Sequence, residues 1–323
     1  MRIALAGNGL LAGCLMRGLL DSTHKIVAIV QNGRETRGIW RRVMPWLGQL
    51  REQDYMPAKA LRHRLPIIWI DKMTEAELAP LRALAPDILL VGGFGVILKR
   101  PILDLPRIGC VNTHSSLLPK HRGPNPFSAA ILAGDAETGV TFHCMDEGID
   151  TGDILAQYPF PITPAERLFS LYRRASEMAG VKVAEVMDRI EAEGLQGTPQ
   201  NHALATYEKK RTIEDTWMDW TQPAEYLERM VRGMSPSPMP RFWYRGQVVR
   251  VANAVHDPAP VDAAPGTVLE KGPPARVATG LGTLQVRVAY VSSPLPWIWP
   301  SPWLHPEPGE SLLPENQERE IVL

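Results

Sequence analysis

The sequence predicts an α/β protein in two parts: a doubly wound, mostly parallel sheet, followed by a small C-terminal β-domain of the OB-like barrel type. Short apolar runs alternate with segments of helical period through the first 114 residues. Beyond residue 205 the runs are valine-rich and broken by Gly and Pro. Alternating strands and helices are typical of a doubly wound sheet, and closely spaced short strands of a small antiparallel domain. The length of 323 residues suits two domains.

The first domain begins with a β-α-β unit, in which apolar runs at 2–7 and 25–30 flank a helical segment at 10–20. Runs of this length suit strands that are buried on both faces of a parallel sheet. The same alternation then continues, with strands expected at 66–70, 87–93 and 108–114 and a helix at 74–84.

The pattern changes after residue 114. We expect a helix at 125–134, strands at 138–145 and 154–160, and a long amphipathic helix at 165–194. Strands are predicted in the second domain at 241–252, 266–270 and 281–291. A tail rich in Pro, Trp and Glu follows, either docked or mobile. The predicted division is a catalytic domain at 1–194, a linker at 195–204, a β-domain at 205–292 and a tail at 293–323.

Composition excludes several classes of protein. The 35 basic and 35 acidic residues balance, so the whole chain lacks the charge surplus of a typical nucleic-acid binder. Three distant cysteines without CxxC spacing argue against a disulfide framework or a metal site. No uncharged apolar run reaches the ~18–20 residues that span a bilayer, and the first residues lack a signal-peptide cleavage site. We therefore expect a soluble, cytoplasmic protein with no membrane partner and no metal.

A glycine-rich turn after the first strand resembles a dinucleotide-binding fingerprint but departs from it. Gly7, Gly9 and Gly13 form GxGxxxG, which is one residue longer than GxGxxG. The second strand ends in Gln31 and Asn32 rather than in the acidic residue that binds a ribose. We interpret these glycines as a tight strand-to-helix turn, which disfavours a dinucleotide-dependent oxidoreductase.

The candidate catalytic residues are Asn112, His114 and Asp150. Asn112 and His114 lie two residues apart at the carboxyl end of an expected strand, so both side chains point to one face. Ligands of open α/β sheets bind beyond this end of the strands. Asp150 follows in a glycine-flanked loop between two expected strands. Spacing alone leaves open whether Asp150 meets His114, and Asp150 could instead be a turn residue.

These residue types suit acyl transfer to an amine. A histidine can take the proton that the attacking amine loses, a carboxylate can orient the imidazole, and Asn112 can donate a hydrogen bond to the carbonyl oxygen. The absence of a GxSxG nucleophile elbow favours direct attack by the amine. His121 and His143 are interpreted as structural histidines, the first in a basic turn and the second within a strand. A catalytically silent binding module is the alternative from another class.

The stretch 109–154 resembles the signature of the folate-dependent formyltransferases. That signature consists of Asn-x-His, SLLPxxRGxxP and TGVTxHxMDxGxDTGDI, which appear here at 112–114, 116–126 and 138–154. The resemblance implies a Rossmann-like catalytic domain, 10-formyltetrahydrofolate as co-substrate, and Asn112, His114 and Asp150 as the catalytic trio.

The resemblance also implies binding residues for folate and for the acceptor. Folate contacts, largely from the backbone, are expected at Val91, Gly92, Gly93, Phe94, Gly95, Val96, Ile97 and Leu98, and at Met145, Asp146, Glu147, Gly148 and Ile149. The family usually has a small residue and Tyr where this chain has Gly93 and Phe94, which leaves the backbone role intact. Substrate-binding residues are expected at Ser116, Leu117, Leu118, Pro119, Arg122 and Gly123.

The amine acceptor stays open between two kinds of molecule. Residues 205–252 resemble the C-terminal module of methionyl-tRNA formyltransferases, and Arg37, Arg41 and Arg42 lie in a segment similar to the basic insertion of that family. Both features imply initiator tRNA as a partner. However, residues 205–292 hold 11 Lys and Arg against 9 Asp and Glu, and the tail holds 1 against 5. Because phosphate contacts require a positive surplus, a small amine such as an amino-sugar nucleotide is the alternative acceptor.

Overall fold

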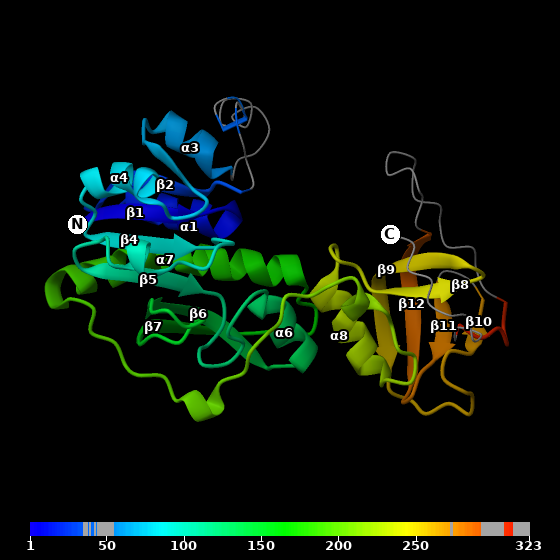
Figure 1. Cartoon of the computed structure of the whole chain (residues 1–323). Helices are drawn as coiled ribbons and strands as arrows, with labels where there is room; N and C mark the ends of the chain where they lie inside the picture. The colour runs from blue at the N-terminus through cyan, green and yellow to red at the C-terminus, as the bar shows by residue number, and fades with distance from the viewer. Residues whose placement is uncertain are drawn as a thin grey trace. The chain divides into compact units, whose positions relative to one another are not determined.

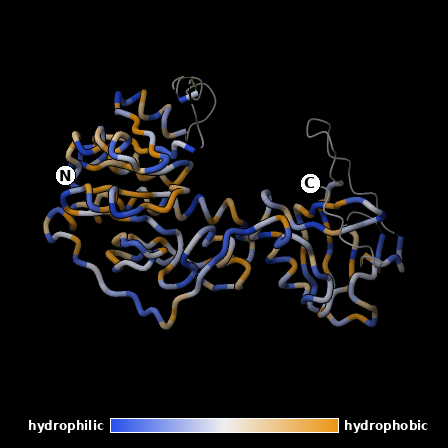
Figure 2. The backbone as a smooth tube through the Cα atoms, viewed as in Figure 1, coloured by the Kyte–Doolittle hydropathy of each residue, from blue (hydrophilic) through white to orange (hydrophobic). Residues whose placement is uncertain are grey.

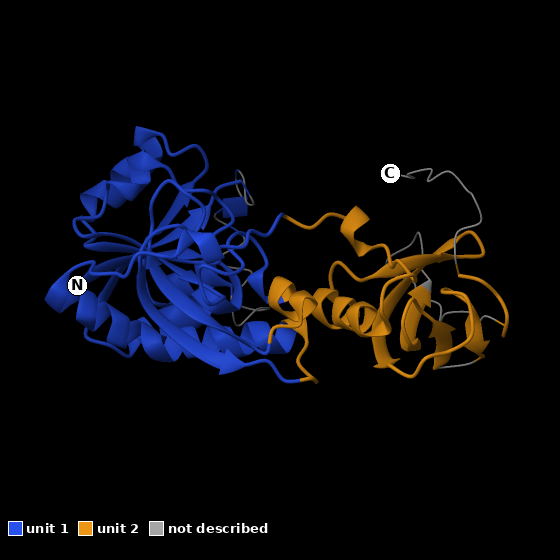
Figure 3. Ribbon diagram, turned by 90° about the horizontal axis from the view of Figure 1, so that it is seen from below, with its two compact units in different colours: residues 1–127, 136–163, 169–209 blue, residues 128–135, 164–168, 210–323 orange. Residues whose placement is uncertain are grey.

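The computed structural model describes residues 1–34, 38, 40–41, 43, 55–271, 274–291 and 307–312. The chain divides into two compact units, which are coloured separately in Figure 3. Unit 1 contains residues 1–127, 136–163 and 169–209, and unit 2 contains residues 128–135, 164–168 and 210–323. The boundaries predicted from the sequence stay a prediction.

Unit 1 is built on a seven-stranded sheet with the order β3-β2-β1-β4-β5-β6-β7 (Figure 1). The strands β1 to β5 are parallel, and β6 and β7 add as antiparallel strands at one edge. Strand order reverses between β1 and β4, as in a doubly wound sheet. The strands are β1 (Arg2–Gly7), β2 (Lys25–Asn32), β3 (Ile67–Ile70), β4 (Ile88–Gly92), β5 (Gly109–His114), β6 (Glu137–Cys144) and β7 (Ile154–Pro161).

The central strands are apolar at successive positions, so both faces of the sheet are hydrophobic. Helices therefore cover both faces. On one face α1 packs against α7 so closely that a Cβ added at Gly18 would lie 2.0 Å from the carbonyl oxygen of Gly180. On the other face Leu78, Leu81 and Ile102 join the strand residues in one buried cluster. Figure 2 shows the hydrophobic residues following the central strands. The helices of unit 1 are α1 (Gly9–Leu20), α3 (Met56–Arg62), α4 (Glu75–Ala83), α5 (Arg100–Leu103) and α7 (Leu168–Glu193).

The glycine-rich turn is structural, as the sequence predicts. A Cβ added at Gly7 would lie 2.0 Å from the carbonyl oxygen of Gly92, and Gly9 has a φ of +70°. The buried Gln31 donates from Nε2 to the carbonyl oxygen of Gly7 at 2.8 Å, at the position where a dinucleotide site needs an acid. This turn therefore joins strand and helix tightly, because side chains do not fit there.

Unit 2 contains a five-stranded antiparallel sheet with the order β10-β11-β12-β9-β8. The predicted strand at 241–252 is in fact two strands joined by a hairpin at Arg245 and Gly246, both of positive φ. The amphipathic helix α8 was not predicted, although its apolar side chains supply part of the core. The elements are α8 (Ala224–Met234), β8 (Arg241–Tyr244), β9 (Gln247–Asp257), β10 (Val268–Glu270), β11 (Ala275–Ala278), β12 (Thr283–Val291) and, from residue 128 onward, α6 (Pro126–Ala133).

The described part of the tail docks on unit 2. Leu312 is buried in its core, Ser311 forms a bridge with Thr267, and Glu310 accepts a hydrogen bond from the hydroxyl of Tyr244 at 3.0 Å. The tryptophans at 297, 299 and 303 lie outside the described residues. Within the described residues, no helix combines the length and the apolar character needed to cross a membrane.

Candidate active site

The candidate site lies at the carboxyl end of β5, where the sheet changes from parallel to antiparallel pairing. In the antiparallel pair, Asn112 stands directly opposite His143 of β6, and His114 stands opposite Thr141. Side chains of directly opposed residues lie on the same face of a sheet. The register therefore brings a second histidine to the face that carries Asn112 and His114.

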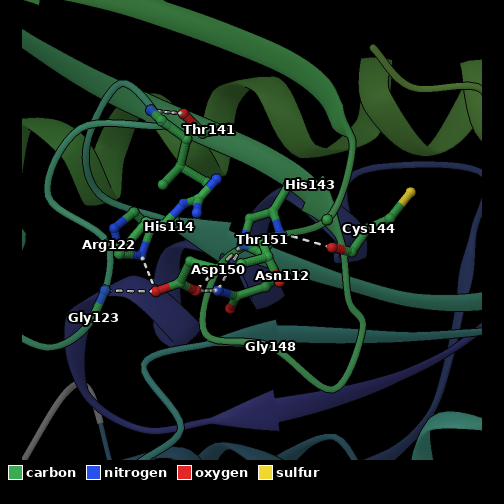
Figure 4. A network of polar contacts seen from close by, with 12 residues as sticks. Asn112, His114, Arg122, Gly123, Thr141, His143, Cys144, Gly148, Asp150 and Thr151 are labelled. Atoms are coloured by element: carbon green, nitrogen blue, oxygen red, sulfur yellow. Dashed lines mark hydrogen bonds and ion pairs between the residues drawn. The ribbon is translucent and has the colours of Figure 1, made fainter. Parts of the chain in front are cut away.

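Asp150 lies at the centre of the site (Figure 4). It belongs to the loop of residues 145–153 between β6 and β7 and has a φ of +53°. Its Oδ1 accepts a hydrogen bond from Asn112 Nδ2 at 3.1 Å, and its Oδ2 accepts one from the backbone amide of Gly123 at 2.8 Å. His114 Nδ1 lies 3.5 Å from Oδ2. The structure thus brings together the three residues that the sequence selects.

The ring of His114 is buried and is held by the main chain. Its Nε2 lies 2.9 Å from the carbonyl oxygen of His121. Because a carbonyl oxygen only accepts, Nε2 carries a hydrogen, and in the neutral ring Nδ1 keeps its lone pair. That lone pair faces the carboxylate of Asp150. A proton that reaches His114 is therefore bound at Nδ1, beside the negative charge.

His143 is part of this site, although the sequence interpretation assigned it a structural role. Its Nδ1 donates to the carbonyl oxygen of Cys144 at 2.7 Å, which turns Nε2 toward Asn112 Nδ2 at 3.1 Å and Asp150 Oδ1 at 3.4 Å. A neutral His143 accepts from Asn112, and a protonated His143 donates to Asp150. The signal that was missed is its position in the motif, six residues after the start of β6 and opposite Asn112.

The pKa values of Asp150 and His114 are both lower than those of the free side chains. Burial by itself raises the pKa of Asp150, but hydrogen bonding from His143, the charge of His114 and the Gly123 amide outweigh it, so that this pKa lies well below 3.8. Burial lowers the pKa of His114 below 6.5, although the Asp150 carboxylate opposes the shift. At neutral pH the site therefore holds an ionised Asp150 and a neutral His114.

The turn at 115–123 is fastened to β6 and β7. Thr141 Oγ1 donates to the carbonyl oxygen of Ser116 at 2.6 Å and accepts from the Leu118 amide at 3.2 Å. Gln157 Nε2 donates to the carbonyl oxygen of Leu118 at 2.8 Å. These contacts bury Ser116 and Leu118. Of the residues predicted to bind substrate in this turn, Gly123 contacts Asp150, whereas Arg122 is fully buried and faces away toward residues 200–207.

The two segments predicted to bind folate pack against one buried cluster. Phe94 of the first segment and Met145 of the second both contact the core formed by strand residues, α4 and α5. The amide of Met145 donates to the carbonyl oxygen of Cys110 in β5 at 3.0 Å. Two large apolar side chains remain exposed on these segments, Ile97 at 66% and Ile149 at 49%.

The basic segment is described only in part. Arg37 and Arg42 lie outside the described residues. Arg41 donates from its guanidinium to the carbonyl oxygen of Gly33 at 2.9 Å, and the guanidinium carbon lies 5.7 Å from the ring centre of Trp69. The substrate-binding role of all three arginines stays a prediction.

Two known protein families together match most of the chain. The family described as formyl transferase matches residues 1–187, and the family described as formyl transferase, C-terminal domain, matches residues 210–291. Among curated proteins, a methionyl-tRNA formyltransferase of Pseudomonas fluorescens (strain SBW25) is 37% identical over 257 residues, which cover 79% of this chain and 78% of that protein. One from Pseudomonas paraeruginosa (strain DSM 24068 / PA7) is 35% identical over 288 residues, covering 88% and 90%.

Solved structures share the fold at low sequence identity. The N-formyltransferase from Helicobacter canadensis, in complex with folinic acid and dTDP-3-aminofucose, has a TM-score of 0.67 at 19% identity, covering 88% of this chain and 98% of that chain. The methionyl-tRNA formyltransferase from Clostridium thermocellum has a TM-score of 0.56 at 16% identity, covering 87% and 100%. At these identities the likeness supports the fold alone, so the acceptor must be argued separately.

Proposed function

The chain belongs to the formyl transferase family, and from this premise we propose that it transfers the formyl group of 10-formyltetrahydrofolate to the α-amino group of methionyl-tRNA. The protein is a folate-dependent N-formyltransferase. The observation that carries the proposed chemistry is the contact of one carboxylate, Asp150, with Asn112, His114 and Gly123.

The geometry supports a direct transfer in which no side chain becomes acylated. The acceptor amine forms a bond to the formyl carbon and loses a proton, and the bond from N10 to that carbon breaks. His114 is neutral at neutral pH and has its lone pair at Nδ1, so it can bind this proton beside Asp150. Asp150 then stabilises the imidazolium that forms. Return of the proton to the departing N10 completes the reaction.

Asn112 is the proposed donor to the formyl oxygen. Its Nδ2 contacts Asp150 Oδ1 and His143 Nε2, each at 3.1 Å, so the amide is held in a defined orientation beside the acid. One donor of this kind contributes roughly 3–4 kcal/mol in other acyl-transfer enzymes. We propose that Asn112 exchanges one of these contacts for the formyl oxygen as negative charge develops there.

The residues present fit a folate. Reduced folate supplies the formyl group at its N10. The exposed Ile97 and Ile149 stand on the two segments predicted to bind it, and ligand pockets are lined mainly by apolar side chains, which suit flat aromatic rings. Backbone amides and carbonyls of the same loops would supply its hydrogen bonds, which keeps the role of 91–98 and 145–149 independent of most side chains.

The proposed acceptor is supported by relatives that cover both units of the chain. Two methionyl-tRNA formyltransferases at 35–37% identity span 79–88% of this chain. Against this stands the low positive charge of residues 205–292, which favours the small-amine alternative.

Formyl transfer measured on a panel of acceptors tests the proposal. The panel holds initiator methionyl-tRNA, a dTDP-linked amino sugar and a hydrophilic amine, each with 10-formyltetrahydrofolate as donor. Transfer to the tRNA with a kcat/KM at least about a hundredfold above the small amines supports the proposal. Transfer only to the amino sugar keeps the chemistry and replaces the acceptor. Absence of transfer to every amine contradicts the proposed reaction.

A further inference from the structure

A segment that lies outside the residues matched by the two families contacts two parts of the site, the turn at 119–123 and the Asp150 loop. Residues 198–208, which we name the strap, lie between the ends of the matched ranges at 187 and 210. The sequence predicts a linker at 195–204 and the start of the second domain at 205. In the structure they belong to unit 1 and are bound to the turn at 119–123 and to the Asp150 loop.

Gln200 joins the strap to the Asp150 loop. Its Nε2 donates to the carbonyl oxygen of Asp150 at 2.9 Å and to that of Gly152 at 2.7 Å. At the base of the loop, Thr198 and Ile154 exchange both backbone hydrogen bonds at 2.9 Å. The buried amide of Gln200 thus binds the main chain of the residue that carries the carboxylate.

The other end of the strap holds His121, whose carbonyl oxygen orients His114. The amide of His121 donates to Thr206 Oγ1 at 2.8 Å, and its Nδ1 donates to Glu208 Oε1 at 3.0 Å. The amide of Arg122 donates to the carbonyl oxygen of Thr206 at 2.9 Å, and the amide of Glu208 donates back to Arg122 at 2.8 Å.

Arg122 connects these two ends. Its guanidinium donates to Gln200 Oε1 from Nε at 3.2 Å and from Nη2 at 2.6 Å, to His202 Nδ1 at 3.0 Å and to the hydroxyl of Tyr207 at 2.6 Å. The side chain is fully buried, and in the described part of the chain no carboxylate pairs with it. A buried charge that is satisfied by neutral acceptors is sensitive to their exact placement.

We propose that the strap is a positioning element of the active site, in which Gln200 and Arg122 set the placement of Asp150 and His114. Gln200 is chemically specific because it must accept from Arg122 and donate to two carbonyl oxygens at once. A glutamate can do the first and not the second. Arg122 thereby acts through other residues and is reassigned from the substrate-binding role that the sequence suggested. The kinetic consequences of this inference rest on the proposed function.

Gln200→Glu separates positioning from charge compensation. The variant gives the buried Arg122 a carboxylate partner, so its charge stays compensated, but it removes both donations to the Asp150 loop. We expect hydrogen exchange of the amides at 145–153 to become at least about tenfold faster and kcat to fall at least about tenfold, with a smaller change in the KM for folate. Gln196→Glu, the same change at an exposed residue of the preceding segment, is the matched control.

A second variant tests the other end of the strap. Thr206→Val removes the acceptor of the His121 amide at an exposed position. We expect the ¹⁵N shifts of the His114 ring to move from a pure Nε2-protonated form toward a mixture of tautomers, because its carbonyl partner loses placement.

The proposal is overturned if the hydrogen-exchange rates of amides 145–153 and the kcat of Gln200→Glu lie within twofold of those of the Gln196→Glu control. It is also overturned if the ¹⁵N spectrum of His114 is unchanged in Thr206→Val. The exchange and ¹⁵N measurements need no turnover. If the unaltered protein transfers no formyl group, the proposed function fails while these two measurements still decide the role of the strap.

Discussion

The carbonyl oxygen of His121 lies 2.9 Å from Nε2 of His114 and thereby determines which ring nitrogen faces Asp150. His121 can present its carbonyl in this way because it has a left-handed φ of +57°. The sequence predicts that a carboxylate, that of Asp150, orients the ring. In the structure the main chain orients the ring, and Asp150 supplies the charge at 3.5 Å.

The rate of formyl transfer should fall at acidic pH, and the pKa of His114 should set the pH at which it falls. Burial lowers the pKa of His114 below 6.5, so the neutral, proton-accepting ring persists to a lower pH than a free histidine allows. We expect the acid limb of the kcat/KM profile to lie below pH 6.5. A profile measured from pH 4.5 to 8.5 checks this, and an acid limb above pH 7 would contradict it.

Asp150→Asn should reduce turnover far more than folate binding. The amide keeps the size of the side chain, but it removes the charge beside His114 Nδ1 and places a donor against Asn112 or Gly123. We expect kcat to fall at least about a hundredfold, since loss of a carboxylate beside a catalytic histidine costs ~10⁴ in serine proteases. Single-turnover rates and folate titration measure the two effects separately, and wild-type turnover would remove Asp150 from the mechanism.

The stability of the fold should depend on the ionisation of Asp150. Because its pKa in the folded state is held below 3.8, the ionised carboxylate stabilises the protein above that pH. This stabilisation is lost as the pH falls through the folded-state pKa. Asp150→Asn should therefore lower the unfolding midpoint by several degrees at pH 7, and the difference should shrink below about pH 4. Thermal unfolding at both pH values tests this, and a pH-independent difference would refute it.

Gly123→Ala should disturb both the carboxylate and the strap. Gly123 has a φ of +93°, and an added Cβ would lie 2.7 Å from the carbonyl oxygen of Glu208. The amide that donates to Asp150 would have to move, so we expect kcat to fall at least about tenfold and the unfolding midpoint to decrease. Gly194→Ala is the control because it has a similar φ of +77° with no atom within 4 Å. Equal kinetic effects of the two changes would contradict this explanation.

Asn112→Asp should lower turnover and make the stability of the protein depend on pH between 7 and 5. The change removes both donations from Nδ2 and puts a second carboxylate 3.1 Å from Asp150 Oδ1. Two carboxylates at that distance share a proton, which raises the pKa of one of them. We expect kcat to fall at least about a hundredfold at pH 7 and stability to recover between pH 7 and 5. Unfolding followed across that range tests the second point, and a loss of stability toward pH 5 would exclude a shared proton.

The local sequence pattern was sufficient to predict the strands of the first sheet and part of the site. The apolar runs located β1 to β7, and the two-residue period of β5 brought Asn112 and His114 to one face. The hairpin at Arg245 and Gly246 and the helix α8 were missed although their signals are local, a turn with a glycine and a regular apolar face. Pattern alone left Asp150 open, and only its place in a family motif selected it.

The sequence by itself determined the fold class and the family, and it predicted the residues proposed to carry the chemistry, because each depends on spacing within a strand, a loop or a motif. The tertiary structure decided how those residues are held. His143 reaches Asn112 through the antiparallel register of β5 and β6, and the His121 amide reaches Thr206 across 85 residues of chain. Gln200 meets the Asp150 carbonyl 50 residues away. Such contacts follow from the path of the folded chain, and no local period encodes them.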